Sequence, residues 1–307
     1  MLNIIANILF VLIMPFLFIG VINRVKSFWA GRQGPSVIQP FFDFFRLLKK
    51  GVVLSASTTS LFYWAPLVSL LAVLGAAILA PMAGGKSIIG FQGDMIVFIY
   101  LLGLSKFVSV ASAMETGSSF EGMGAAREAA FTSLVEPAFF IIMGSAVAAS
   151  GVMDFSGVRA LLLNREPSGV LAAVLCSLAL FIILLTEGSR VPVDDPNTHL
   201  ELTMIHEVMV LDNSGPDLAI INYTAGLKMF VIASVLACFL TPAGLHPVAA
   251  GFLFAGIVFV CALIAGCVES LMARFRMTHV PQFVFFSISI AVVAFAIVLL
   301  KLNGGLR

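Results

Sequence analysis

Ionisable side chains are concentrated in residues 186–207, TEGSRVPVDDPNTHLELTMIHE, although 60% of the 307 residues in this chain are hydrophobic and only 11% are charged. Histidines and carboxylates interleaved at a membrane boundary can exchange protons near neutral pH. The same polar segment would also suit docking onto a soluble partner. The groups expected to take part in proton transfer here are Glu187, Arg190, Asp194, Asp195, His199, Glu201, His206 and Glu207.

Two prolines divide this segment. Glu187 and Arg190 are three residues apart, a spacing at which they can form an ion pair on one helical turn. Pro192 and Pro196 end that helix, so the aspartates between them are expected on an irregular segment that is buried in protein or lines a cavity. A second helix, capped by its first residue, is predicted over residues 197–209.

The sequence predicts no metal site and no catalytic motif. His199 and His206 are two helical turns apart, about 10 Å, which is too far to bind one ion, and no H-E-x-x-H pattern is present. All four cysteines lie in apolar runs without C-x-x-C spacing. There is also no Walker A or G-x-S-x-G sequence. We therefore expect a chain that binds no cofactor and is not an enzyme by itself.

Several further charges interrupt the apolar runs. An ionisable group at membrane depth costs about 2.5–3.5 kcal/mol, so it must face protein, water or an opposite charge. Glu136 lies about 11 Å beyond Glu128 along one predicted helix and directly precedes Pro137, which makes it the deepest acid. It could be a carboxyl hydrogen-bonded within the bundle. We favour a proton path that also includes Lys106, Glu115, Glu121 and Glu128.

Two charges near helix ends have simpler interpretations. Lys228 could extend its ammonium group to the membrane interface. Glu269 is expected to pair with a basic neighbour. Neither residue is predicted to belong to the proton path.

Apolar windows of the length that crosses a bilayer indicate an all-α integral membrane protein. The N-terminal window is expected to be a retained span, because no basic residue precedes it. A net charge of +1 gives no field that would attract nucleic acid. The chain is predicted to form a single membrane domain, 1–307, with eight helices at about 2–22, 61–82, 91–113, 130–151, 170–187, 225–242, 247–268 and 281–301.

The distribution of basic residues predicts the orientation, because Lys and Arg are retained in cytoplasmic loops. Only three basic residues lie in the loops after the second, fourth and sixth helices. Ten lie in the loops after the odd-numbered helices, and we therefore expect both termini outside. These ten are Arg24, Lys26, Arg32, Arg46, Lys49, Lys50, Arg127, Arg190, Arg274 and Arg276.

The first loop contains a predicted interfacial element at residues 39–50, QPFFDFFRLLKK. Its mixture of phenylalanines and basic residues is typical of an amphipathic helix at the membrane surface. Such a helix could simply lie among lipid headgroups. We favour a helix that docks against a partner or lines an entrance.

Four motifs in this order resemble the family of respiratory complex I subunit 1 and its hydrogenase relatives. They are GRQGPSVIQPFFDFFRLLKK, ETGSSFEGMGAAREAAFTSLVEP, EGSRVPVDDPNTHLEL and VESLMARFR. The resemblance covers nearly the whole chain and is strongest for the group 4 [NiFe]-hydrogenase branch, which includes formate hydrogenlyase and hydrogenase-4. It implies a multi-pass protein of the cell inner membrane.

The resemblance also implies a function and partners. The chain would anchor a soluble redox arm to antiporter-like membrane subunits and couple electron transfer to proton or sodium movement. The [NiFe] and iron–sulfur clusters would be held by hydrogenase-like large and small subunits and an iron–sulfur protein. By motif, Glu136 matches the family's intramembrane glutamate, and Glu187, Arg190 and Asp194 match its E-x-x-R-x-P-x-D element. The expected redox-arm interface comprises Arg32, Gln39, Asp43, Arg46, Arg127 and Arg274.

The fifth loop departs from the complex I pattern. Complex I members carry E-x-N-R-x-P-F-D-L, whereas this chain has EGSRVPVDDPNTHLEL and a shorter first loop. This departure favours a hydrogenase-type complex over one that binds quinone tightly. The alternatives are a quinone-binding subunit of an NADH–quinone oxidoreductase and a free-standing cation transporter.

Overall fold

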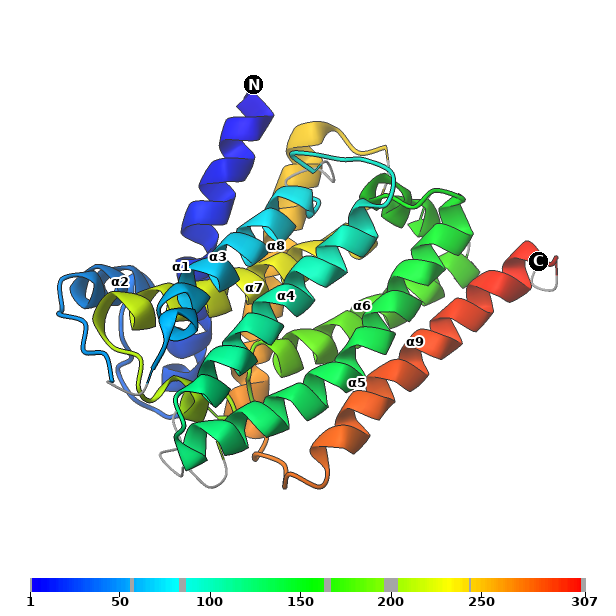
Figure 1. Ribbon diagram of the computed structural model, residues 1–307. Coiled ribbons are helices and arrows are strands. Elements are labelled where there is room, and N and C mark those ends of the chain that lie inside the picture. Colours follow the sequence, from blue (N-terminus) through cyan, green and yellow to red (C-terminus); the bar gives the residue numbers. More distant parts are fainter. Residues whose placement is uncertain are drawn as a thin grey trace.

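The computed structural model describes residues 2–55, 58–82, 87–162, 167–195, 204–242 and 244–304. Helices account for nearly all of the regular structure in these ranges (Figure 1). In chain order they are α1 (Leu2–Trp29), α2 (Gln39–Leu48), α3 (Ser60–Leu79), α4 (Asp94–Glu115), α5 (Ser119–Ser150), η1 (Phe155–Leu162), α6 (Pro167–Glu187), η2 (Glu207–Val210), α7 (Gly215–Leu240), α8 (Pro247–Leu271) and α9 (Val280–Leu302).

Eight of these helices are long and apolar enough to cross a membrane, all the α-helices except α2. The all-α membrane fold and the number of spans are therefore confirmed. Around the bundle, α3 packs on α4, α4 on α5, α5 on α9, α9 on α6, α6 on α7, and α7 again on α3. Helices α1 and α8 pack together against α7. Because α7 has neighbours on both sides, 83% of its most apolar window is buried, more than in any other described span.

The short helix α2 matches the predicted interfacial element, and aromatic packing holds it in place. Phe44 contacts Phe16 of α1 and Tyr223 of α7, with ring centroids 5.5 and 5.7 Å apart. Phe42 and Phe45 on the same helix are exposed. In Figure 1, α2 lies beside the bundle, next to α1. An apolar face therefore remains for the membrane interface.

Two helices begin earlier than their hydropathy predicts. Helix α5 begins at Ser119 and not near residue 130, so Glu128 lies in its third turn. Hydropathy windows stop at charges, but these charges are buried with partners, so the helix continues through them. Helix α7 begins at Gly215, whose φ of +54° and close approach to the carbonyl oxygen of Gly51 favour glycine.

The prediction of a helix over residues 197–209 is wrong for residues 204–209, the part that the structure describes. Residues 197–203, with His199 and Glu201, lie outside the described residues. Residues 204–206 form no α-helix, and the 3₁₀-helix η2 follows. The backbone N–H groups of Ile205 and His206 donate to the Asp194 carboxylate, so they are not available for helical hydrogen bonds.

Candidate functional site

Four buried charges from four helices form a continuous row, which we call the ion chain: Glu128, Lys106, Glu187 and Lys228. Lys106 of α4 forms an ion pair with Glu128 of α5. Its Nζ lies 3.6 Å from Oε2 of Glu187 at the end of α6, and the same oxygen lies 3.7 Å from Nζ of Lys228 of α7. All four residues are at most 8% exposed. The two positive and two negative charges therefore balance each other at membrane depth.

Lys228 corrects a prediction from the sequence. From the sequence its ammonium group could reach the interface, but only 6% of the residue is exposed, and it faces Glu187. The position of Lys228 in a hydrophobic run gave no indication of this pairing. Helix α7 is the central helix of the bundle, so its side chains meet α6 and not the membrane surface.

The spacing of Glu187 and Arg190 predicted an ion pair between them, but in the structure Arg190 does not pair with Glu187. Nη1 of Arg190 lies 3.2 Å from Oε1 of Glu269, and Nζ of Lys26 lies 2.7 Å from Oε2 of the same carboxylate. The cause is the end of α6: Arg190 N–H donates to Leu185 C=O, and Ser189 adopts a left-handed φ of 50°. This turn directs residues 187 and 190 to different neighbours. Glu269 therefore pairs with basic side chains, but these come from α1 and from the loop after α6, and neither is a neighbour of Glu269 in the sequence.

Asp194 organises the irregular segment that follows. It is 1% exposed and accepts backbone hydrogen bonds from Asp195, Ile205 and His206 at 2.9–3.1 Å. Arg274 also pairs with it at 2.9 Å. Burial raises the pKa of the Asp194 carboxyl above its usual value, while these donors act in the opposite direction. The predicted irregular, buried segment is confirmed at this residue.

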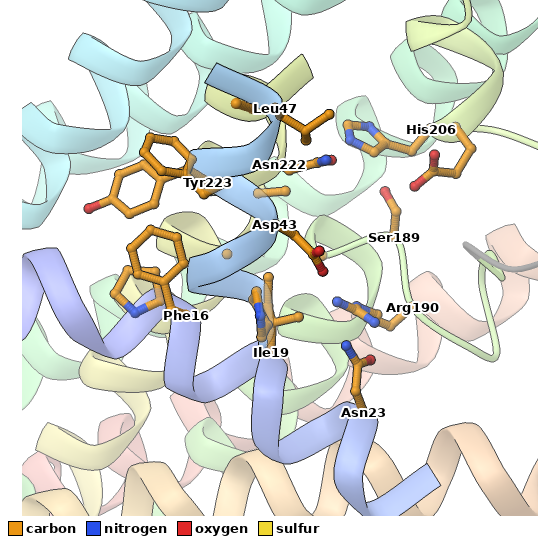
Figure 2. A pocket seen from close by; sticks show the side chains of 18 of the residues that line it. Phe16, Ile19, Asn23, Asp43, Leu47, Ser189, Arg190, His206, Asn222 and Tyr223 are labelled. Carbon is orange, nitrogen blue, oxygen red and sulfur yellow. The ribbon is translucent and has the colours of Figure 1, made fainter. Parts of the chain in front are cut away.

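A cavity of about 230 Å³, the first cavity, lies between α1, α2, α7 and the loop after α6. Figure 2 shows Phe16 and Tyr223 on one side, and Arg190, Ser189 and His206 on the other. The cavity therefore has one aromatic wall and one polar wall. Its lining includes Asp43, Asp194 and Glu207, which the sequence singled out, and Asn23 and Asn222, which it did not.

His206 borders this cavity as a neutral side chain. Burial, together with the charges of Lys106, Lys228 and Arg190, lowers its pKa to about 3. His206 is therefore not the group that titrates near neutral pH, as its unperturbed pKa would suggest.

The His206→Gln variant is expected to depend less on pH in its thermal stability than the wild type. The unfolded chain takes up a proton on His206 below about pH 6.5, whereas the folded protein does so only near about pH 3. The stability contribution is thus complete above about pH 6.5 and is lost as pH falls towards 3. Unfolding midpoints of both purified proteins at about pH 7, 6 and 5 test this. An equal fall of the unfolding midpoint in the variant and the wild type between about pH 7 and 5 would contradict this prediction.

Glu136 has a different environment from the ion chain. It is exposed on the side of the bundle, and its Oε1 lies beside Gly103 of α4. A gap of about 10 Å³ is lined by Glu136, Lys106 and Glu187 together. Around it, Tyr100 and Phe140 pack edge to face and are also exposed. The acid therefore connects the ion chain with the lateral surface.

Other predicted proton-path residues lie apart from the ion chain. Glu115 accepts a hydrogen bond from Thr59 N–H at 2.8 Å, and Glu121 accepts one from Asp212 N–H at 3.0 Å. Both therefore fasten loops to helix ends. Asp195 lies next to Asp194 at the edge of the site and is partly buried.

The residues predicted to face a redox arm divide into two groups. Arg32, Gln39, Asp43 and Arg46 lie in or near α2, where Gln39 donates to Asp43 at 3.0 Å and Arg46 pairs with it at 3.0 Å. By contrast, Arg127 donates to the carbonyl oxygen of Met204 at 2.8 Å. Arg274 pairs with Asp194. Both arginines therefore bind the loop after α6 of this chain.

A family model described as NADH dehydrogenase matches residues 2–300. The chain belongs to the NADH dehydrogenase family. Within this family it is 30% identical over 249 residues to hydrogenase-4 component C of Escherichia coli (strain K12), an alignment that covers 78% of this chain and 75% of the relative. It is 26% identical to formate hydrogenlyase subunit 4 of the same organism, over 90% of this chain and 91% of that one.

The NADH dehydrogenase family also supplies more distant relatives. One subunit of the NADH-quinone oxidoreductase of Wolbachia pipientis wMel is 26% identical over 67% of both chains. Among solved structures, a chain of the membrane-bound sulfane sulfur reductase, an archaeal respiratory membrane complex, has the same fold. Its TM-score is 0.82 at 17% identity, with 97% of this chain and 98% of that chain covered. The resemblance inferred from the four motifs is confirmed, and the chain is a multi-pass membrane protein.

Proposed function

We propose that this chain is the membrane coupling subunit of a group 4 [NiFe]-hydrogenase or formate hydrogenlyase type of complex. It holds a soluble redox arm on its loop face and links electron transfer to proton or sodium movement in the cell inner membrane. The relatives named hydrogenase-4 component C and formate hydrogenlyase subunit 4 support this assignment, with alignments over 78% and 90% of this chain.

The observation that carries the proposal is the continuity from the first cavity through the ion chain to Glu136. Ser189 and Asp194 line the first cavity and also a gap of about 10 Å³ beside Lys106 and Glu128. Lys106 then shares the next gap with Glu136. A change of charge at the cavity therefore acts on a row of ionisable groups that ends at the lateral surface. Such rows mark ion pathways in membrane proteins.

The partners follow from the two ends of this path. Both termini lie outside, so the basic loops and α2 face the cytoplasm and receive the hydrogenase-like large and small subunits and the iron–sulfur protein. These partners hold the [NiFe] and iron–sulfur clusters. Glu136 is exposed in the span α5, where lipid would not solvate its carboxylate. An antiporter-like membrane subunit covers this surface.

The first cavity supports a second candidate, a site for a quinone ring. Its aromatic wall suits stacking, and Asn222 and Arg190 supply hydrogen-bond donors for carbonyl oxygens. Its volume of about 230 Å³ is below the roughly 300–1,000 Å³ of most ligand pockets and suits a small head group. Tight binding of a quinone by the isolated chain and by the complex alike would favour this alternative.

Mass spectrometry of the gently solubilised native complex tests the proposed function. We expect this chain to co-purify with iron–sulfur proteins, a large catalytic subunit and antiporter-like subunits. A free-standing cation transporter would purify as an active monomer or homodimer instead. Isolation of such a form without any redox partner would contradict the proposal.

A further inference from the structure

A second cavity, the serine cavity, lies between α3, α4 and α7, close to the ion chain. It has a volume of about 50 Å³. Ser105, Ser109 and Ser112 line it from one face of α4, at helical spacings of four and three residues. Ser69 of α3 and Thr224 of α7 complete this hydroxyl lining. A row of hydroxyl groups between membrane helices needs hydrogen-bond partners.

Part of this need is met within the protein. The hydroxyl groups of Ser69 and Ser105 are hydrogen-bonded to each other at 2.7 Å. The hydroxyl groups of Ser109 and Thr224 donate to carbonyl oxygens of their own helices, at 2.9 and 2.7 Å. A hydroxyl oxygen that donates its one proton retains lone pairs. These oxygens therefore remain acceptors beside the cavity.

Three side chains around the cavity have unsatisfied atoms. Nδ2 of Asn213 and Nδ1 of His206 are buried and have no hydrogen-bond partner among the described residues, and Oε2 of Glu187 has only the ammonium groups of Lys106 and Lys228, 3.6 and 3.7 Å away. All three residues line the serine cavity, and Asn213 and Glu187 are each only 8% exposed. A buried neutral amide or imidazole group without a hydrogen bond is costly, by about 1–3 kcal/mol. Their convergence on one cavity indicates a polar occupant.

The size of the cavity is suited to water. A cavity needs roughly 10–15 Å³ to admit one water molecule, and a water molecule in the liquid takes about 30 Å³, so about 50 Å³ has room for a few. Lys228 also lines the cavity, and its positive charge opposes a bound metal cation. The lining offers donors at Lys228 and Asn213 and acceptors at Glu187 and the hydroxyls, which suits molecules that both donate and accept.

We propose that the serine cavity binds a chain of water molecules and forms a second proton route, from the loop at residues 211–213 to Glu187 and Lys228 of the ion chain. Leu211 and Asp212 are exposed and directly precede the buried Asn213. Val210 and Asn213 line the cavity on either side of these two residues, so the proposed route has its outer end at this loop and not at the first cavity. The water site is inferred from the lining and the volume of the cavity, whereas its role in proton supply rests on the proposed function.

Hydroxyl-radical footprinting of the whole complex in H₂¹⁸O tests the water site. Met209 lines the cavity and is 4% exposed, while Met95 is 1% exposed in the apolar core. Bound water should give Met209 a labelled oxidation several-fold faster than Met95. Equal protection of both methionines overturns the proposal, and this comparison needs no variant.

Two matched variants test the route. Ser109→Val fills the cavity with apolar groups, whereas Ser289→Val makes the same change at an exposed serine of α9 with the same hydrogen bond to its own helix. Ser109→Val should lower Met209 labelling and reduce coupled turnover about tenfold, and Ser289→Val should change neither. Lower labelling with full turnover overturns the route. Failure of the wild-type complex to move ions would instead contradict the proposed function and leave the labelling result standing.

Discussion

Replacing Glu187 by Gln is expected to lower ion-coupled turnover at least about tenfold while the complex still assembles. Glu187 is the one member of the ion chain between two cations, with Lys106 and Lys228 at 3.6 and 3.7 Å. Glutamine has nearly the same shape but cannot accept or release a proton at this position. The proton transfer that Glu187 would provide between the two lysines is therefore lost.

Glu115→Gln is the matched control for this prediction. Glu115 carries the same functional group but accepts a backbone hydrogen bond from Thr59, which a glutamine oxygen can also accept. We expect near wild-type turnover. Hydrogenase-type activity and ion uptake, measured on both reconstituted variants, provide the comparison. A similar loss in the two variants would show that Glu187 has no special place in the path.

Replacing Glu269 by Ala is expected to destabilise the protein by about 3–5 kcal/mol. Glu269 is the partner of both Lys26 and Arg190, and its side chain is fully buried. Its loss leaves the Arg190 side chain, which is only 11% exposed, without its carboxylate partner. It also removes the connection of α1 and α8 with the loop after α6. The unfolding midpoint of the purified protein should fall clearly.

Asp43→Ala provides the control, because it breaks an ion pair at the surface. Arg46 and Asp43 have side chains that are 70% and 38% exposed. Such pairs contribute about 0–1 kcal/mol, so this variant should unfold almost as the wild type does. Equal midpoints for the Glu269→Ala variant and the wild type would mean that the buried pairs do not hold these elements together.

The fold was largely predictable because bilayer-length apolar runs leave little choice of structure. Eight windows became eight spans, and the basic, phenylalanine-rich first loop became α2. Element boundaries were less predictable. Hydropathy placed the start of the fourth span near residue 130, although α5 begins at Ser119 and the acids Glu121 and Glu128 are buried in it. Burial of a charge depends on a partner from another helix, and one helix's sequence does not contain that information.

The site was predictable in its residue types and unpredictable in its pairs. Spacing joined Glu187 with Arg190, but the left-handed turn at Ser189 separated them, and each found a partner from a distant helix. Lys228 was assigned to the interface because a lone lysine on an apolar helix usually reaches it. Long-range pairs of this kind become visible only when the bundle is assembled.

The most direct test of the coupling account is the number of ions moved per electron pair in proteoliposomes that contain the complete complex. Glu187→Gln and Glu136→Gln lie at the middle and the lateral end of the proposed path, and Glu115→Gln lies outside it. We predict that the first two variants lower this ratio while Glu115→Gln keeps the wild-type value. An unchanged ratio in both path variants would contradict the account.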